Sequence, residues 1–436
     1  MQERSVQQWV DYIQTLHHRE IELSLDRVRQ VYQRLYPLGM SCKVITVAGT
    51  NGKGSTAEMI ASIYAESGCR VGKFSSPHLV DFAERYNING RNVSDQALLD
   101  AFVKIEQART EIPITFFEFG TLLAIELFSA AEVDVAVMEV GLGGRLDAIN
   151  IIDADVAIIT SISIDHTAWL GNTLEEIGRE KAGIARANRP CIVGIKQPPE
   201  SITEYCAEIG ANVQLLGRDF DYKEDTPVAD SWFWNSAVLD KELGNLPLPF
   251  SQAGVQLSNA SLAIHAVCLL GDELPVTDEQ FIKGIEAASI LARCQVVSES
   301  PLLILDVAHN ESSMTRLRTF VDQKIANKGS RTDTTVYAIC GMLQDKEISK
   351  SLSCFIGLVD HWNFVTIENE RGASAEYLSS IFDEVSADEP SSVSVNTYDK
   401  MTEAYQQVSK ELTANDILVV FGSFFVAGDI LKLINK

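Results

Sequence analysis

The stretch Val44-Ile-Thr-Val-Ala-Gly-Thr-Asn-Gly-Lys-Gly-Ser-Thr56 joins a β-branched apolar segment to a glycine-rich turn that carries one lysine and two hydroxyls. We expect the apolar segment to form a buried strand. Gly49, Gly52 and Gly54 would let the backbone adopt φ > 0 and bring its N–H groups close to an anion. A helix expected over 57–65 would direct its positive end to the same place. The stretch therefore predicts a phosphate-binding loop, with Lys53 on the outer phosphates.

This loop departs from the common spacing G-x-x-x-x-G-K-[ST], because Val47 stands where the first glycine belongs and Gly54 follows the lysine. The alternative is a plain strand-to-helix connector with a solvated lysine. We favour the phosphate loop because strand, turn, lysine, hydroxyls and helix occur in the required order, with Ser55 or Thr56 near a metal.

The composition sets outer bounds on the protein class. The chain has 436 residues, of which 46% are hydrophobic and 22% charged, so we expect a soluble globular protein of two or three domains. A formal net charge of −24 argues against a nucleic-acid surface, which needs clustered lysines and arginines. No apolar signal core and no run of about 18 apolar residues is visible, so we expect a cytoplasmic protein without membrane contact. Eight isolated cysteines indicate free thiols.

Short β-branched strands alternate with helical stretches, which indicates an α/β fold with doubly wound, mostly parallel sheets. This pattern is interrupted between 219 and 257, where we expect irregular β structure, and it resumes near Gln295. We therefore expect one domain over 1–290, a linker over 291–296 and a smaller domain over 297–436. The expected strands are 44–47, 70–74, 133–140, 156–161, 191–195, 302–305, 335–340, 362–367, 392–396 and 417–421.

Four polar clusters follow the loop along the chain. Glu139 ends an apolar strand, and Asp165-His166 ends another, so both would lie at the carboxyl edge of a parallel sheet, where such folds bind ligands. A lone histidine is by default a packed or solvent-facing residue, but its position favours a functional one. Lys181 lies between small residues, which is compatible with a functional lysine. The alternative interpretation is a surface charge on a helix, paired with Glu175 or Glu176. The fourth cluster, 306–310, follows a strand of the second domain, with Arg293 just before it.

Seven ordered motifs together resemble the bifunctional dihydrofolate synthase/folylpolyglutamate synthase family of bacteria, which belongs to the ATP-dependent Mur-type ligases. The motifs are Val47-Ala-Gly-Thr-Asn-Gly-Lys-Gly-Ser55, Ser75-Ser-Pro-His-Leu79, Phe116-Phe-Glu-Phe-Gly120, Glu139-Val-Gly-Leu-Gly-Gly-Arg-Leu-Asp147, Ser163-Ile-Asp-His166, Gly178-Arg-Glu-Lys-Ala-Gly183 and Asp306-Val-Ala-His-Asn310.

The resemblance implies a P-loop-type ATPase domain that also binds the pterin or folate substrate, followed by a smaller Rossmann-like glutamate ligase domain. It implies an enzyme that adds L-glutamate to dihydropteroate, giving dihydrofolate, and to tetrahydrofolate. Each addition would pass through an acyl phosphate and release ADP and phosphate. The cofactors implied are ATP and Mg²⁺ at two sites, and a monovalent cation is compatible with them. We expect a monomer.

The resemblance also assigns residues to roles. Those implied to hold ATP are Asn51, Gly52, Lys53, Gly54, Ser55, Asn259, Arg293 and Asp306. Those implied to bind Mg²⁺ are Ser76, Glu139 and His166, and those implied in catalysis are Lys53, His166, Lys181 and His309. Lys181 matches the lysine that the family carries as a carbamate. Those implied to hold dihydropteroate are Glu22, Leu23, Ser24, Thr115, Phe116, Phe117, Glu118, Leu146, Asp147 and Ala148.

The sequence departs from the family pattern at two places, and three alternative functions stay open. Relatives commonly carry Pro-Gly-Arg at the linker, where this chain has Leu291-Ala-Arg-Cys294, and Phe425 replaces a frequent histidine. The alternatives are a monofunctional folylpolyglutamate synthase, a Mur-type cell-wall amino-acid ligase and a non-catalytic ATP-binding scaffold. The sequence leaves open the length of the polyglutamate chain, the preferred folate, the linkage type and the effect of the linker departure on ATP closure.

Overall fold

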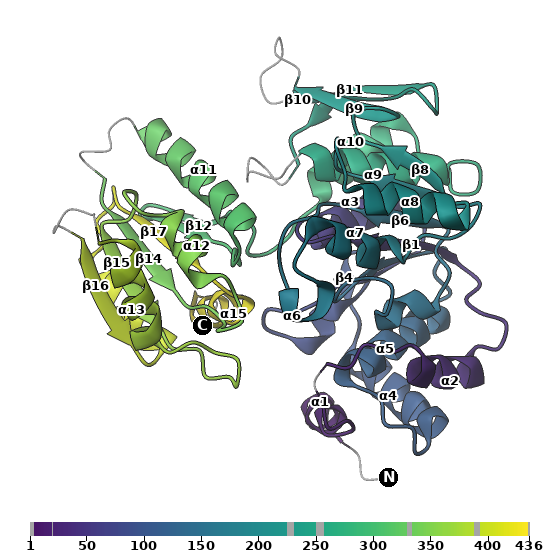
Figure 1. Cartoon of the computed structure of the whole chain (residues 1–436), viewed down its shortest axis with the longest axis horizontal. Coiled ribbons are helices and arrows are strands. Elements are labelled where there is room, and N and C mark those ends of the chain that lie inside the picture. Colours follow the sequence, from purple (N-terminus) through teal and green to yellow (C-terminus); the bar gives the residue numbers. More distant parts are fainter. Residues whose placement is uncertain are drawn as a thin grey trace. The chain divides into compact units, whose positions relative to one another are not determined.

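The chain forms two compact units in the computed structural model. The structure describes residues 4–19, 21–224, 231–249, 257–328, 334–387 and 393–434. Unit 1 comprises Met1–Ser251 and Gln256–Ser289, and unit 2 comprises Gln252–Val255 and Ile290–Lys436. The end of unit 1 at Ser289 lies two residues before the linker expected over 291–296. Each unit is described by itself below (Figure 1).

Unit 1 contains an eight-stranded sheet with the strand order β4-β3-β2-β5-β1-β6-β7-β8. The six strands from β2 to β8 in this order run parallel, and β3 and β4 add an antiparallel edge. The central strands are almost entirely buried, which fits their β-branched sequence. The bounds are β1 Lys43–Ala48, β2 Val71–Phe74, β3 Tyr86–Ile88, β4 Arg91–Asn92, β5 Val135–Glu139, β6 Val156–Ile159, β7 Pro190–Val193 and β8 Asn212–Leu215.

Helices cover both faces of this sheet. Helix α3 packs with α9 and α10, and α10 approaches it so closely that a Cβ on Gly284 would lie 2.5 Å from the Cα of Ile63. Helices α1, α2, α4 and α5 gather at one end of the unit (Figure 1). The bounds are α1 Val6–Gln14, α2 Asp26–Leu35, α3 Lys53–Glu66, η1 Phe82–Arg85, α4 Asp95–Arg109, α5 Phe116–Ala130, η2 Ala148–Ile151, α6 Thr167–Leu170, α7 Leu174–Ala182, α8 Glu200–Ile209, α9 Leu257–Leu269 and α10 Asp278–Ala287.

The segment expected to be irregular β structure forms a three-stranded antiparallel sheet of β9 (Phe220–Glu224), β10 (Ser231–Ser236) and β11 (Lys241–Pro247). The expected β structure is thus present, and its irregularity is confined to a register shift between β10 and β11 at Trp232 and Trp234. Burial alternates along β10, with Trp232 and Trp234 fully buried, so aromatic side chains form one face of a true sheet. Residues 225–230 and 250–256, which the same expectation covered, lie outside the described residues.

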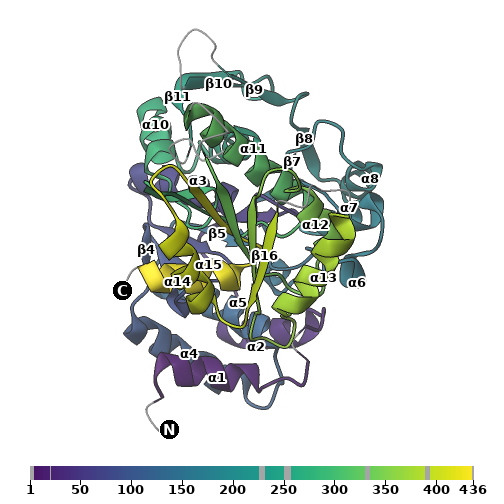
Figure 2. The same cartoon turned by 90° about the vertical axis from the view of Figure 1, so that its left-hand side faces the viewer.

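Unit 2 contains a six-stranded sheet with the order β12-β13-β17-β14-β15-β16, parallel except for β12. Helices α12 and α13 lie on one face of this sheet and α14 and α15 on the other (Figure 2), so it is doubly wound. The bounds are β12 Gln295–Glu299, β13 Leu302–Leu305, α11 Glu311–Lys328, β14 Val336–Cys340, α12 Ile348–Ser353, β15 His361–Val365, α13 Ala375–Val385, β16 Ser394–Tyr398, α14 Met401–Glu411, β17 Ile417–Phe421 and α15 Phe424–Ile434.

Each of the ten strands expected from the sequence overlaps an observed parallel strand, with ends that differ by at most two residues, and 302–305 and 417–421 match at both ends. The sequence reading missed β3, β4, β8 and β12, which are short or lie at sheet edges and have exposed positions. All eight cysteines are free thiols, as expected. Among the described helices, none combines the length and apolar character that crossing a membrane requires.

Candidate active site

The phosphate loop follows β1 and leads directly into α3. Gly49 has φ +149° and Gly52 has φ +86°, and a Cβ on Gly49 would lie 1.8 Å from the Oγ1 of Thr160, so only glycine fits there. Helix α3 begins at Lys53, earlier than expected. The expectation that Gly54 has φ > 0 was therefore wrong, because Gly52 makes the left-handed turn and Gly54 already lies in the helix.

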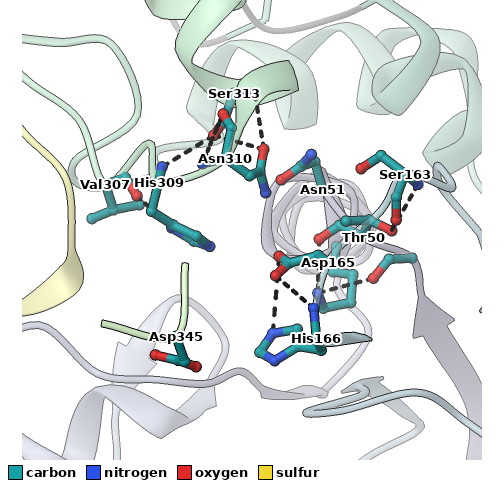
Figure 3. A network of polar contacts seen from close by, with 12 residues as sticks. Thr50, Asn51, Ser163, Asp165, His166, Val307, His309, Asn310, Ser313 and Asp345 are labelled. Atoms are coloured by element: carbon teal, nitrogen blue, oxygen red, sulfur yellow. Dashed lines mark hydrogen bonds and ion pairs between the residues drawn. The ribbon is translucent and has the colours of Figure 1, made fainter. Parts of the chain in front are cut away.

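Hydrogen bonds to the chain after β6 hold this loop in place (Figure 3). The N–H of Thr50 donates to the carbonyl of Ser161 at 2.8 Å, and its hydroxyl accepts from the N–H of Ser163 at 3.0 Å. The N–H of Asn51 donates to the Ser161 hydroxyl at 3.0 Å. The loop is thus fixed by protein contacts alone, which is the preorganisation that an anion site needs.

Lys53 and Lys181 both donate to the same carbonyl oxygen. The Nζ atoms of both lysines lie 3.1 Å from the oxygen of Gly49, and that of Lys53 lies 3.2 Å from the oxygen of Thr50. Lys181 is only 5% exposed, and burial, together with the charge of Lys53, lowers its pKa to about 7. The surface-charge alternative for Lys181 is wrong, because its side chain points into the unit.

Glu175 and Glu176, the partners expected if Lys181 were a surface charge, bind other groups. Glu175 accepts the N–H groups of Glu200 and Ser201, and Glu176 closes a capping box with Thr173 at the start of α7. The two glutamates in the first turn of α7 therefore bind backbone N–H groups, and Lys181 in its last turn reaches the phosphate loop.

Ser76 and Glu139 meet at the carboxyl edge of the sheet. Strands β2 and β5 are parallel neighbours, and the N–H of Ser76 lies 3.3 Å from Oε2 of the buried Glu139. His166 caps α6 with a left-handed backbone, φ +52°, and its N–H donates to Oδ1 of Asp165 at 2.8 Å (Figure 3). The structure thus brings together Ser76 and Glu139 at this edge.

These donors fit Mg²⁺, although within the described residues no group of three or more His, Cys, Asp or Glu is arranged to hold a metal. Mg²⁺ usually keeps several waters and binds through one or two carboxylates plus substrate phosphates. Glu139 with the Ser76 hydroxyl supplies that kind of partial ligand set beside the phosphate loop.

The segments expected to hold dihydropteroate are joined by an arginine that the sequence analysis did not single out. Arg27, on α2, donates to a carboxylate oxygen of Glu22, and its Nη2 lies 3.2 Å from Oε1 of Glu118. Glu118 in turn accepts the N–H of Thr115 at 2.7 Å in the capping box of α5. No local motif marks Arg27, because Glu118 lies 91 residues away.

The other expected pterin residues surround the turn after β5. The ring of Phe117 lies against Gly141, where a Cβ would be 2.5 Å from Cζ of the ring. Asp147 is buried, and its two oxygens accept the N–H groups of Leu142 and Ile149 at 2.8 and 3.0 Å. Burial raises the pKa of Asp147 to about 6. A pterin N–H would therefore share these oxygens with the backbone. Phe116, Leu146, Leu23 and Ser24 are partly buried and Ala148 is buried.

Of the remaining residues expected to contact ATP, Asn259 belongs to unit 1. It packs on the phosphate loop, since a Cβ on Gly52 would lie 2.6 Å from its Oδ1. Ser55 is buried in the first turn of α3.

In unit 2, the fully buried Asp306 holds the turn after β13. Its two oxygens accept the N–H groups of Cys294 and Ala308 at 2.6 and 2.7 Å. The guanidinium of Arg293 lies 5.3 Å from the ring centroid of Phe424. His309 has its Nδ1 2.8 Å from the carbonyl of Val307, which makes Nδ1 the protonated nitrogen (Figure 3). Asp306 thus fixes both the linker residue Cys294 and the loop that carries His309.

Comparisons with known proteins identify the class first. The Mur ligase middle domain matches residues 47–264, and the Mur ligase glutamate ligase domain matches residues 292–424. The fold and this domain pair define a Mur-type ligase, which confirms the expected two-domain α/β architecture.

Individual relatives narrow the assignment. The dihydrofolate synthase/folylpolyglutamate synthase of Escherichia coli strain K12 is 40% identical over 428 residues, covering 98% of this chain and 95% of that protein. The structure of E. coli FolC in complex with DHPP and ADP matches with a TM-score of 0.89 at 38% identity, covering 99% and 98% of the two chains. A bifunctional folylpolyglutamate synthase/dihydrofolate synthase with Mn, AMPPNP and L-glutamate bound matches with a TM-score of 0.87 at 39% identity, covering 99% and 98%.

The chain therefore belongs to the bifunctional dihydrofolate synthase/folylpolyglutamate synthase family. It is an ATP-dependent ligase that joins glutamate to a folate substrate.

Proposed function

We propose that this protein joins L-glutamate both to dihydropteroate, giving dihydrofolate, and to tetrahydrofolate, extending it to polyglutamates. The main support for two activities is the pair of contacts that Arg27 makes with Glu22 and Glu118. Through these contacts one guanidinium joins two segments that are expected to line a dedicated pterin pocket. A relative with a TM-score of 0.89 binds DHPP and ADP, which supports a pteroate-type substrate.

The reaction proceeds in two bond exchanges. A carboxylate oxygen of the acceptor attacks the γ-phosphorus of ATP, and ADP leaves. The amine of glutamate then attacks the acyl carbon, an amide bond forms, phosphate departs and the amine loses a proton. Lys53 offsets phosphate charge, and the N–H groups around Gly52 bind phosphate oxygens. Mg²⁺, held by Ser76 and Glu139, would neutralise phosphate charge when bound.

We further propose that Lys181 carries a carbamate in the active enzyme. Carbamate formation needs a neutral amine to attack CO₂, and a pKa of about 7 provides a large neutral fraction at physiological pH. Modification also replaces the second cation beside Gly49 with an anion, which removes the repulsion between Lys53 and Lys181. His166 and the carbamate would hold a second Mg²⁺, which would neutralise negative charge on the acyl phosphate.

The remaining assignments rest on the family motifs. We propose that Asn51, Asn259, Arg293 and Asp306 take part in ATP binding, either by contacting ATP or by holding a segment that does. We place His309 near the γ-phosphate. Asp306 supports ATP binding through the turn that it holds, since both its oxygens already accept backbone N–H groups. We propose a cytoplasmic monomer, because the two units of one chain carry the complete set of expected residues.

Phosphate release tests the proposal directly. The purified protein should release phosphate from ATP only when dihydropteroate and L-glutamate are both present, and tetrahydrofolate should replace dihydropteroate. Release with tetrahydrofolate alone as acceptor would replace the bifunctional proposal with a monofunctional folylpolyglutamate synthase. Release with neither acceptor, but with a nucleotide-linked muropeptide precursor, would favour a cell-wall ligase. A scaffold would release none.

A further inference from the structure

Arg85 is a buried cation in unit 1 for which the described residues supply no carboxylate. It is the last residue of η1, it is 7% exposed, and no described Asp or Glu lies within ion-pair distance of its guanidinium. The adjacent Glu84 is occupied, because its carboxylate accepts the N–H groups of Leu79, Val80 and Asp81. Burial lowers the pKa of Arg85 from its ordinary value, which reflects the cost of burying a charge that the Phe82 and Phe116 rings and more distant carboxylates compensate only in part.

The partly buried Arg27 and the buried Arg109 of the same unit both have carboxylate partners. Arg27 pairs with Glu22 and Glu118, and Arg109 lies 2.6 Å from Oε2 of Glu106. A buried arginine without a carboxylate partner is costly to maintain, so a ligand anion is the simplest partner that would justify it.

The geometry around Arg85 leaves its outer donors available to such an anion. Its Nε donates to Nδ1 of His78 at 2.8 Å, and the guanidinium lies 5.2 Å from the ring centroid of Phe116. The two Nη groups make no hydrogen bond within the described ranges. Because Nδ1 of His78 accepts from Arg85, His78 holds the guanidinium in one orientation.

Arg85 also lies beside the edge where the reaction takes place. Its carbonyl accepts the N–H of Ser75 at 3.1 Å, and the next residue, Ser76, reaches Glu139. The charge of Glu139 acts on Arg85, since it raises the pKa of the guanidinium against the larger effect of burial. Phe116, whose ring centroid lies 5.2 Å from the guanidinium, belongs to the segment assigned to the pterin substrate. Arg85 thus lies near both a residue of the proposed aromatic pocket and the metal edge.

We propose that Arg85, supported by His78, binds the carboxylate of the acceptor substrate that is to be phosphorylated. This inference rests on the proposed function. A pteroate is an elongated molecule with a pterin at one end and a carboxylate at the other, so its carboxylate must extend from the aromatic pocket towards the phosphate loop. A guanidinium binds a carboxylate through two parallel hydrogen bonds, which fixes the attacking oxygen in direction. The acyl phosphate is also anionic and keeps the contact.

The test compares dihydropteroate with its carboxamide, which has the same rings but no charge. Binding of each ligand is measured by titration calorimetry in the presence of ADP, for wild type and for Arg85→Gln. We expect wild type to prefer the carboxylate, and Arg85→Gln to lose about tenfold to a hundredfold in affinity for it while binding the carboxamide as before. Affinity for ADP should not change.

Arg27→Gln is the matched variant, because Arg27 is a partly buried arginine near the pterin-side residues and should weaken both ligands equally. If Arg85→Gln discriminates between carboxylate and carboxamide as well as wild type does, the inference is wrong. Should Arg85→Gln not fold, Arg85→Lys replaces it: the single ammonium should reduce the discrimination several-fold, and unchanged discrimination would again overturn the inference. Failure of the wild type to bind or turn over dihydropteroate would instead overturn the proposed function.

Discussion

The phosphate loop and the flank formed by α2 and α5 lie in the same unit but are stabilised in opposite ways. The loop consists of neighbouring residues whose backbone is fixed by hydrogen bonds to Ser161 and Ser163. The flank is joined by contacts between distant segments, an apolar core shared by α2 and α5 and the Arg27 guanidinium, which reaches a carboxylate 91 residues away. The loop should therefore tolerate loss of a functional side chain without losing its shape, whereas the flank should lose shape and ligand affinity together.

Lys53→Ala is the substitution with the largest expected effect on turnover. The Lys53 ammonium donates to the carbonyl oxygens of Gly49 and Thr50 within the loop and is not part of the apolar core, so its removal should leave the fold intact. Loss of a charge-assisted phosphate contact in a water-excluded site should reduce kcat by about a hundredfold or more. Phosphate-release kinetics measure the rate, and circular dichroism checks the fold. A folded variant with wild-type turnover would break the phosphate-loop assignment.

Lys181→Ala should come next, with near-complete loss of activity that a short-chain carboxylate such as acetate partly restores. Acetate would replace the carbamate anion in the space left by the side chain. Rescue by acetate but not by a neutral amide of similar size separates the carbamate from a mere packing role. Electron density for an unmodified ammonium in an active crystal with ATP and Mg²⁺ would contradict the carbamate.

Titration of Lys181 should make the stability of the protein depend on pH. In the absence of CO₂ its folded pKa of about 7 lies below the ordinary value of 10.5, so the unfolded chain binds the extra proton between these values. Stability should therefore rise with pH from about 7 to 10 in CO₂-free buffer, and Lys181→Met should lessen that rise. Unfolding midpoints at three pH values measure it. An identical slope in the two proteins would show that Lys181 is not the buried group responsible.

Arg27→Gln should affect the flank through Glu118, which is left buried without its cation. We expect a loss of about 1–3 kcal/mol in the free energy of unfolding and a higher KM for dihydropteroate, with the KM for ATP unchanged. Arg29→Gln is the matched control, since Arg29 is exposed on the same helix. Equal behaviour of the two variants would remove the distinction between loop and flank.

Asp147→Asn should change the pH dependence of stability, an effect that appears only below neutral pH. The folded pKa of about 6 exceeds the ordinary 3.8, so the native state keeps a proton that the unfolded chain has lost, and stability should fall as pH rises from about 4 to 6. The asparagine variant should lose that slope, which amounts to about 3 kcal/mol at most. Asp272→Asn, at an exposed site, is the control. A slope that persists in Asp147→Asn would assign it to another carboxylate.

These contrasts also explain what the sequence could predict. The parallel strands and the loop were predictable because their signals lie in adjacent residues: β-branched runs, then glycines and a lysine. Gly54 was misjudged because adjacent residues do not say which glycine makes the turn. The edge strand β4 and the exposed strand β12 were missed because their side chains lack apolar alternation.

The sequence could not predict three features: the burial of Lys181, the contacts of Arg27 with Glu22 and Glu118, and the absence of a paired carboxylate at Arg85 among the described residues. Each depends on which distant segments the fold brings together, and no local spacing encodes that. Glu118, for example, is implied in pterin binding by its motif, but its capping of α5 and its pairing with Arg27 appear only in the folded chain.

The most direct test of the central claim is mass spectrometry of the products formed when dihydropteroate and tetrahydrofolate are offered separately with ATP and L-glutamate. The account predicts that dihydropteroate gains one glutamate to become dihydrofolate and that tetrahydrofolate gains one or more, each addition matched by one ADP. Unchanged dihydropteroate beside extended tetrahydrofolate would contradict the dedicated pterin pocket, and unchanged acceptors in both reactions would contradict folate ligation altogether.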